Sequence, residues 1–381
     1  MRCLRCGNSE HRFFYKDQSV WYCRKCIGFG RMNVNEVPKR TVYERKKHSC
    51  TYDLDYGLTP KQHVASEAIC YHTSHHQSVL AYAVCGAGKT EMVMEVMKKY
   101  LNEGKKVGFA ISRRQVVLEI KERMQKAFKG LNVIAVCEGY TDVCDGDIIV
   151  CTMHQLYRYH QTFDLLIMDE VDAFPYRGND ILKQIAMHAS TGEIVYLTAT
   201  PDEEMLKDVE EGSLQIVELF QRPHGYPLIE PRILTRPKSF QFLYLVKFLF
   251  KQRKEHIQTL VFVPTIALAR KLSVALRPLF RCVSFTSKSE NKEDIVRAFH
   301  EKKYECLITT TILERGITIK GIYIIVLQAD HVVFNEASLT QIIGRVGRNI
   351  DMPTGKGIFL CTKKTSDILR CERAIQMMNR R

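Results

Sequence analysis

Residues 79–90 read VLAYAVCGAGKT, and this stretch decides the fold. Its first six residues predict a short buried strand, and the glycines that follow predict a tight turn before a helix that starts near Glu91. The same alternation of short apolar runs with amphipathic stretches extends from residue 56 through the second half of the chain. We therefore expect an α/β protein with parallel sheets.

The turn in this stretch has the chemistry of a phosphate-binding loop. The backbone N–H groups of Gly86, Ala87 and Gly88 can face inward around phosphate groups. Lys89 can then reach the β- and γ-phosphate oxygens, and the Thr90 hydroxyl can coordinate magnesium. Alanine replaces the first glycine of the strict pattern, but the glycine-x-glycine-lysine-threonine core is intact. We expect ATP and Mg²⁺ to bind here.

Carboxylates follow a second predicted strand, Leu165–Met168. Because the carboxyl ends of parallel strands meet at one edge of a sheet, Asp169 and Glu170 are expected beside the phosphate loop. Asp169 is predicted to hold magnesium through its water shell, and Glu170 to act as the general base that polarises the attacking water. An acidic surface loop without catalytic function is the alternative.

Two arginines in the second half are predicted to stabilise phosphate charge. Arg345 and Arg348 lie in the stretch QIIGRVGR, residues 341–348. A spacing of three residues would place them on one helical face, from which either could act as an arginine finger. The alternative is that they only bind nucleic acid or form ion pairs.

Four of the fourteen cysteines occur as two C-x₂-C pairs, Cys3 with Cys6 and Cys23 with Cys26. This spacing is typical of a structural four-cysteine zinc site, and the residues between the pairs predict the hairpin of a zinc ribbon. A redox dithiol is the alternative, but four thiolates around one metal leave no free group for redox chemistry. The basic and aromatic residues of this module also suit contact with a nucleic-acid strand.

The charge of this 381-residue chain is unevenly distributed. The formal net charge is +14, and residues 234–381 hold 26 basic and 12 acidic side chains, whereas residues 56–233 hold 18 and 24. A basic excess of this kind indicates a polyanionic partner. The amino terminus lacks the apolar core of a signal peptide, and no apolar run approaches the length of a membrane span, so a cytoplasmic location is expected.

These motifs together resemble superfamily 2 helicases and translocases from about Leu58 to Arg348. The resemblance implies two tandem RecA-like lobes that close on ATP. It also implies further site residues, with Gln62 reading the adenine edge and Gly316 in a motif that contacts the nucleotide. The candidate contacts to nucleic acid are Arg113, Arg114, Thr152, Thr311 and Arg315.

The stretch DEVDAFPY at residues 169–176, the stretch TILERG at 311–316 and the four-cysteine module in front narrow the resemblance to the late competence protein family ComFA. This resemblance implies an ATP-driven translocase that pulls single-stranded DNA through a membrane channel during natural transformation. It also implies partners, namely a membrane channel protein and other competence proteins, and a possible peripheral location at the inner face of the cytoplasmic membrane. Repair, replication-restart and RNA helicases share much of this core.

The expected organisation is therefore a zinc module with a basic linker at residues 1–55, an ATP-binding lobe at 56–222 and a second lobe at 223–381. The expected cofactors are ATP, Mg²⁺ and Zn²⁺. Translocation on single-stranded DNA is favoured over unwinding, because no long insertion remains to form a wedge. The alternatives are a repair, replication-restart or RNA helicase, and an ATP-binding scaffold without motor activity.

Overall fold

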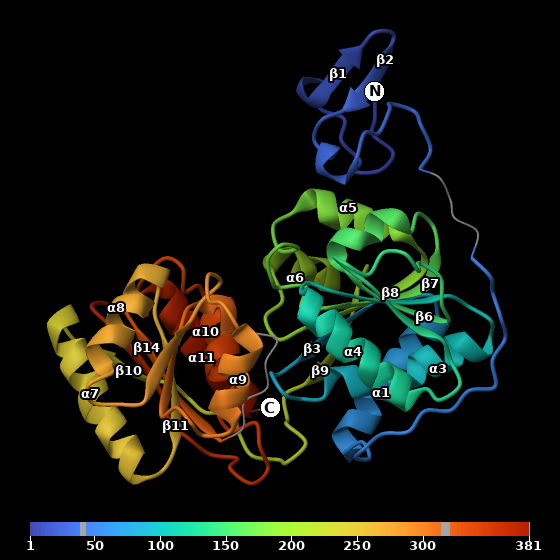
Figure 1. Ribbon diagram of the computed structural model, residues 1–381. Coiled ribbons are helices and arrows are strands. Elements are labelled where there is room, and N and C mark those ends of the chain that lie inside the picture. Colours follow the sequence, from blue (N-terminus) through green and yellow to red (C-terminus); the bar gives the residue numbers. More distant parts are fainter. Residues whose placement is uncertain (39–42, 314–320, 381) are drawn as a thin grey trace. The chain divides into compact units, whose positions relative to one another are not determined.

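Short apolar runs form the buried central strands of two parallel sheets, as their lack of polar residues predicts. The computed structural model describes residues 1–38, 43–313 and 321–380. Its residues group into two units, one of Met1–Ala83 with Gly88–Leu219 and one of Val84–Ala87 with Phe220–Arg381. Figure 1 traces the elements of each unit along the chain from blue to red.

The sheet of the first unit has the strand order β5-β6-β4-β7-β8-β3-β9, and every neighbouring pair is parallel. Helix α1 contacts α3 and β9, while α4 contacts β5 and β6. The strands are β3 Val79–Ala83, β4 Val107–Ile111, β5 Val133–Val136, β6 Ile148–Thr152, β7 Phe163–Asp169, β8 Ser190–Thr198 and β9 Gln215–Leu219. The helices are α1 Pro60–Ser74, α2 Lys89–Met92, α3 Met94–Asn102, α4 Arg114–Ala127, α5 Asp180–Ala189, α6 Glu203–Glu210 and the 3₁₀ helix η3 Met153–Arg158.

The sheet of the second unit has the order β10-β15-β14-β11-β13-β12 and is also parallel throughout. Helix α7 packs on β11 and β15, and α8 packs on β12 and β13. The strands are β10 Arg232–Thr235, β11 Gln258–Phe262, β12 Cys282–Phe285, β13 Cys306–Thr309, β14 Ile322–Leu327 and β15 Gly357–Cys361. The helices are α7 Lys238–Lys254, α8 Ile266–Leu276, α9 Lys292–His300, α10 Glu336–Ile343, α11 Ser366–Arg380 and the 3₁₀ helix η4 Thr311–Leu313. The predicted α/β class with two parallel sheets is confirmed.

The amino-terminal module is an antiparallel hairpin with two short 3₁₀ helices. Strands β1 Phe14–Asp17 and β2 Val20–Cys23 pair in register, as a zinc ribbon requires. The helices are η1 His11–Phe13 and η2 Ile27–Phe29. The module's small core consists of its four cysteines with Phe14 and Met32, so little apolar surface holds it together.

The segment expected to be a linker is fixed to the first unit over its described carboxyl-terminal part. The Cys50 amide donates to Asn102 at 2.8 Å, and the Asp53 amide donates to the Ala127 carbonyl at 3.0 Å. Tyr43 packs against Tyr159, whose ring centroid lies 5.6 Å away. Backbone hydrogen bonds therefore hold this polar segment, although its sequence has no helical or strand periodicity.

No helix within the described ranges combines the length and apolar character needed to cross a membrane.

Candidate nucleotide and zinc sites

The phosphate loop follows β3 directly, as the sequence predicts. Gly86 and Gly88 have φ angles of 84° and 81°, a region in which the backbone of residues other than glycine is strained. Gly88 precedes α2, so Lys89 and Thr90 begin a helix whose free N–H groups face the turn. Thr90 is buried and Lys89 is half-buried. This arrangement fits the triphosphate of a nucleotide.

Two adjacent carboxylates end β7 in the same unit. The Glu170 amide donates to Asp169 Oδ1 at 2.8 Å, and Glu170 has a φ of 54°, which turns the chain sharply after the strand. Burial and the charge of Glu170 raise the pKa of Asp169, Lys89 opposes them, and the resulting pKa is about 7. Lys89 and both carboxylates therefore share one electrostatic environment. Carboxylate and hydroxyl oxygens are ligands that Mg²⁺ prefers, so Asp169 and Thr90 fit a magnesium ion.

A hydrogen bond connects the acidic motif to the strand beside it. Asp172 is buried and accepts a hydrogen bond of 2.6 Å from the Thr200 hydroxyl, just after β8. The Thr200 amide in turn donates to the Thr198 hydroxyl at 3.0 Å. Asp172 was not among the predicted site residues, although its place three residues after Asp169 in the acidic motif was the available signal.

The predicted nucleic-acid residues of the first unit lie at this same edge of the sheet. Ile111 of β4 is in register with Thr152 of β6, so Arg113 follows one strand and Thr152 ends its neighbour. Thr152 is buried, and Arg114 is exposed. The Arg114 Nε donates to the Glu138 carbonyl at 2.8 Å. The sheet therefore brings Arg113, Arg114 and Thr152 together, but contact with a strand stays a prediction.

Gln62 has a structural role that the sequence analysis did not predict. Pro60 starts α1 and Thr59 caps it, with the Gln62 amide donating to the Thr59 hydroxyl at 3.3 Å. The Gln62 side-chain oxygen accepts from the Thr59 amide at 2.9 Å, which completes a capping box. The side-chain amide of Gln62 also fills the space that a Cβ on Gly88 would occupy. Gln62 thus connects the helix start to the phosphate loop.

The predicted arginines of the second unit do not share a helix. Helix α10 ends at Ile343, before both arginines, and Gly347 between them has a φ of 69°. The expectation of one helical face is therefore wrong, because α10 ends before Arg345 and the left-handed turn at Gly347 separates the two arginines. Arg345 is buried, and the Arg348 Nε donates to the Gly344 carbonyl at 3.0 Å. Their part in phosphate chemistry stays a prediction.

A buried arginine that the sequence analysis missed organises this turn. Arg222 donates to the carbonyls of Gly344, Val346 and Cys85 at 2.6, 2.7 and 3.0 Å, all within the second unit. Burial and the nearby charge of Arg348 together lower the pKa of Arg222 to about 10. The Cys85 thiol also donates to Gln341 at 3.0 Å. Because Arg222 lies in a proline-containing break with no motif around it, the sequence offered no signal.

The four cysteines of the amino-terminal module converge as a metal site requires. Their sulfur atoms all lie within 4.8 Å of one another, with Cys3 to Cys26 at 3.7 Å and Cys6 to Cys23 at 3.8 Å. Tetrahedral zinc with bonds of about 2.3 Å implies sulfur separations of about 3.8 Å. Arg5 donates to the Cys26 sulfur at 3.2 Å and to its carbonyl at 2.9 Å, which orients the second pair. The site fits Zn²⁺ with structural coordination.

Two predicted site residues, Arg315 and Gly316, lie outside the described residues. Thr311 is described and begins η4, two residues after β13.

Family models match both halves of the chain. The model described as the res subunit of type III restriction enzymes matches residues 55–203, and the helicase conserved C-terminal domain matches residues 241–350. The first match contains the phosphate loop and the acidic motif. The second match contains the turn with Arg345 and Arg348.

Two curated relatives match almost the whole chain. Competence protein ComFA of Streptococcus pneumoniae is 34% identical, with 99% of this chain and 90% of the relative covered. Competence protein ComFA of Bacillus subtilis is 33% identical, with 99% and 85% covered. A solved structure of the DEAD-box helicase Mss116 bound to single-stranded RNA has a TM-score of 0.62 at 16% identity, with 84% of this chain and 77% of that chain covered. This likeness confirms the fold of helicase lobes.

Proposed function

Because this chain belongs to the ComFA family of helicase-like competence proteins, we propose that it moves along single-stranded DNA and thereby imports transforming DNA across the cytoplasmic membrane. The chain is a nucleic-acid-dependent ATPase of the helicase type. The translocation, the direction of transport and the membrane channel partner belong to the proposal. A peripheral position at the inner membrane face would follow from binding that channel.

The observation that best supports an active motor is the group of Lys89, Thr90, Asp169 and Glu170 in the first unit. Lys89 would bind the β- and γ-phosphate oxygens, and the amides of Gly86 to Gly88 would orient the phosphates. Mg²⁺, held by Thr90 and Asp169, would neutralise phosphate charge. Glu170 would take a proton from the attacking water. A scaffold without turnover has no need for this complete set of groups.

Glu170 has a neighbour that can orient it for this task. The Ser112 hydroxyl donates to Glu170 Oε2 at 3.4 Å, from the residue after β4. Since Arg113 and Arg114 follow directly, a strand bound there would shift the segment that contacts the general base. This connection offers a route by which nucleic acid stimulates hydrolysis. Arg345 and Arg348 would stabilise the negative charge of the transferred phosphoryl group.

The test is ATP turnover with single-stranded DNA, RNA or duplex present. We expect DNA to stimulate turnover more than RNA of the same length does. Lys89→Ala should lower kcat by on the order of a hundredfold or more, because it removes a charge that stabilises the transferred phosphate. Lys99→Ala, at an exposed position of α3, is the matched control and should keep full activity.

Three outcomes would contradict parts of the proposal. Equal stimulation by RNA and DNA would favour an RNA helicase. No turnover by the wild-type chain under any condition would favour the scaffold. Turnover that survives Lys89→Ala would remove the site assignment.

A further inference from the structure

A cationic groove lies at the amino ends of two strands in the second unit. It is an open cavity of about 650 Å³. Arg281 and Glu305 precede β12 and β13 directly, and Cys282 is in register with Cys306. Because the strands are parallel, Thr309 and the segment after it lie at the opposite edge of the sheet. The groove is therefore separate from the predicted site residue Thr311.

One wall of the groove contains a bidentate ion pair. Arg253 donates to both oxygens of Glu305, with Nε to Oε1 at 2.6 Å and Nη2 to Oε2 at 3.0 Å. Its guanidinium also lies 4.6 Å from the ring centre of Phe280. Glu305 Oε2 accepts the Arg281 backbone amide at 2.8 Å as well. Glu305 is thus held within this wall, and its one negative charge, which also acts on Arg281, cannot balance all the cations that line the groove.

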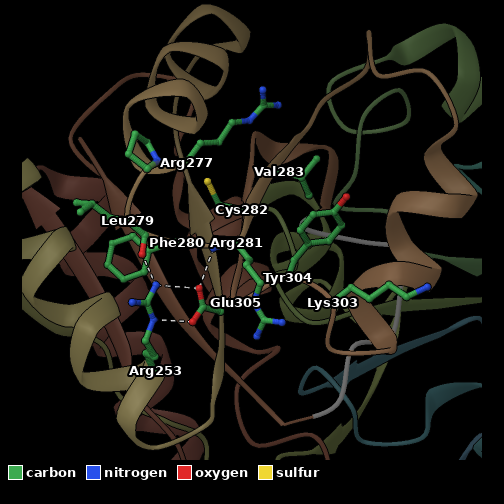
Figure 2. A pocket seen from close by; sticks show the side chains of 11 residues that line it. Arg253, Arg277, Leu279, Phe280, Arg281, Cys282, Val283, Lys303, Tyr304 and Glu305 are labelled. Carbon is green, nitrogen blue, oxygen red and sulfur yellow. Dashed lines mark hydrogen bonds and ion pairs between the residues drawn. The ribbon is translucent and has the colours of Figure 1, made fainter.

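The remaining cations of the groove face solvent. Arg277 and Arg281 are exposed, and neither makes an ion pair with any other described residue. Lys303 pairs with Glu301 at 2.6 Å, but both side chains are exposed, and such surface pairs contribute little. Figure 2 shows the Arg277 side chain extending upward and the Arg281 side chain extending downward in the view. Two separated guanidinium groups suit two separate anionic groups better than a single one.

We infer that this groove binds the sugar-phosphate backbone of single-stranded DNA, an inference that rests on the proposed function. The groove would be a second DNA contact of this unit, at the amino edge of its sheet. Each arginine can hold a phosphate, and the half-buried Tyr304 with Pro278 offers a surface for a sugar or base. Such a contact lengthens the strand segment held by the second unit. It also explains the exposed charges of Arg277 and Arg281, which form no ion pair with another described residue.

The experiment compares the salt dependence of DNA binding between the wild-type chain and Arg277→Ala/Arg281→Ala. Alanine at residue 281 keeps the backbone hydrogen bond to Glu305, so the melting temperature should be unchanged. Binding of labelled oligothymidylates of graded length is measured by fluorescence anisotropy. For long oligomers, the slope of log K against log salt should fall by about 1.4, or about 0.7 per lost phosphate contact. The shortest oligomers that bind should show no change.

The matched control is Lys247→Ala/Lys271→Ala, which removes two exposed charges outside the groove lining and should leave the slope at the wild-type value. An equal slope for the groove variant and the control overturns the inference. So does a groove variant that binds DNA normally but loses binding to polyglutamate, since the partner is then an acidic protein. A loss only of inorganic phosphate binding also overturns it. If the wild-type chain itself does not bind DNA, the proposed function fails instead.

Discussion

Gln62 holds a helix start and a phosphate loop in place with one side chain. Its oxygen completes the capping box with Thr59, and its amide packs against Gly88. A side chain fixed in this way loses little further entropy when a nucleotide binds nearby. The predicted reading of the adenine edge and the observed capping are therefore compatible, and substitution can separate them.

We expect Gln62→Ala and Thr59→Ala to lower stability similarly, by about 1 kcal/mol, because both remove the capping box. Only Gln62→Ala should reduce the preference for ATP over GTP, by about tenfold for one lost hydrogen bond. Thermal melting measures the first effect, and kcat/KM for the two nucleotides measures the second. An unchanged preference in Gln62→Ala would leave this residue with the capping role alone.

At the scale of single residues, those that belong to a local motif could be predicted and those outside one could not. Lys89, Thr90, Asp169 and Glu170 could be predicted because a strand, a turn and a helix of adjacent residues position them. Arg222 could not, because its partners are carbonyl groups of Cys85 and of a turn more than 120 residues away in the chain. Backbone carbonyls carry no sequence signature, so a side chain that binds them leaves no pattern.

At the scale of elements, buried apolar runs identified most strands of both sheets. The predicted strand Leu165–Met168, for example, forms the middle of β7, Phe163–Asp169. Strands β5, β9, β10 and β15 were not predicted. β10 reads RILT between two prolines, and it becomes a strand only because β15 pairs with it along its length. Pairing of this kind depends on distant residues, which a short edge sequence does not reveal.

The zinc module is the element whose stability depends most on one bound ion. Since its core is essentially the cysteine cluster, metal binding should provide its folding free energy. Cys23→Ser is expected to lose the zinc ion and unfold the module, while the basal ATPase of the lobes remains. Zinc content by mass spectrometry and ATP turnover check both points. Cys144→Ser, which touches no predicted ligand, should retain zinc, and zinc retained by Cys23→Ser would contradict the site.

For the whole molecule, the separation of charge agrees with a division of tasks. The stretch with the predicted magnesium ligands has an acidic excess, and residues 234–381 have 26 basic against 12 acidic side chains. Composition predicted a polyanionic partner from this excess. It could not locate the groove beside Arg281, because that surface forms only when strands β12 and β13 are placed next to each other.

Movement without strand separation is expected of the whole chain. The described residues form a hairpin module and two sheets with their helices, and among them we find no further folded segment to act as a wedge. The protein should therefore displace streptavidin from biotinylated single-stranded DNA in an ATP-dependent reaction and leave a blunt or tailed duplex intact. Lys89→Ala should neither displace streptavidin nor unwind the duplex. Efficient duplex unwinding would show that the two lobes suffice to separate strands.

The burial of the cysteines has a practical consequence for following this protein in solution. All fourteen lie in the described ranges, and thirteen are buried, whereas Cys144 is partly accessible. A maleimide dye should therefore label the native chain at one position without altered cysteines. Removal of zinc would unmask four more thiols, so the labelling stoichiometry should rise from about one to about five. A colorimetric thiol count would then report metal occupancy in each preparation.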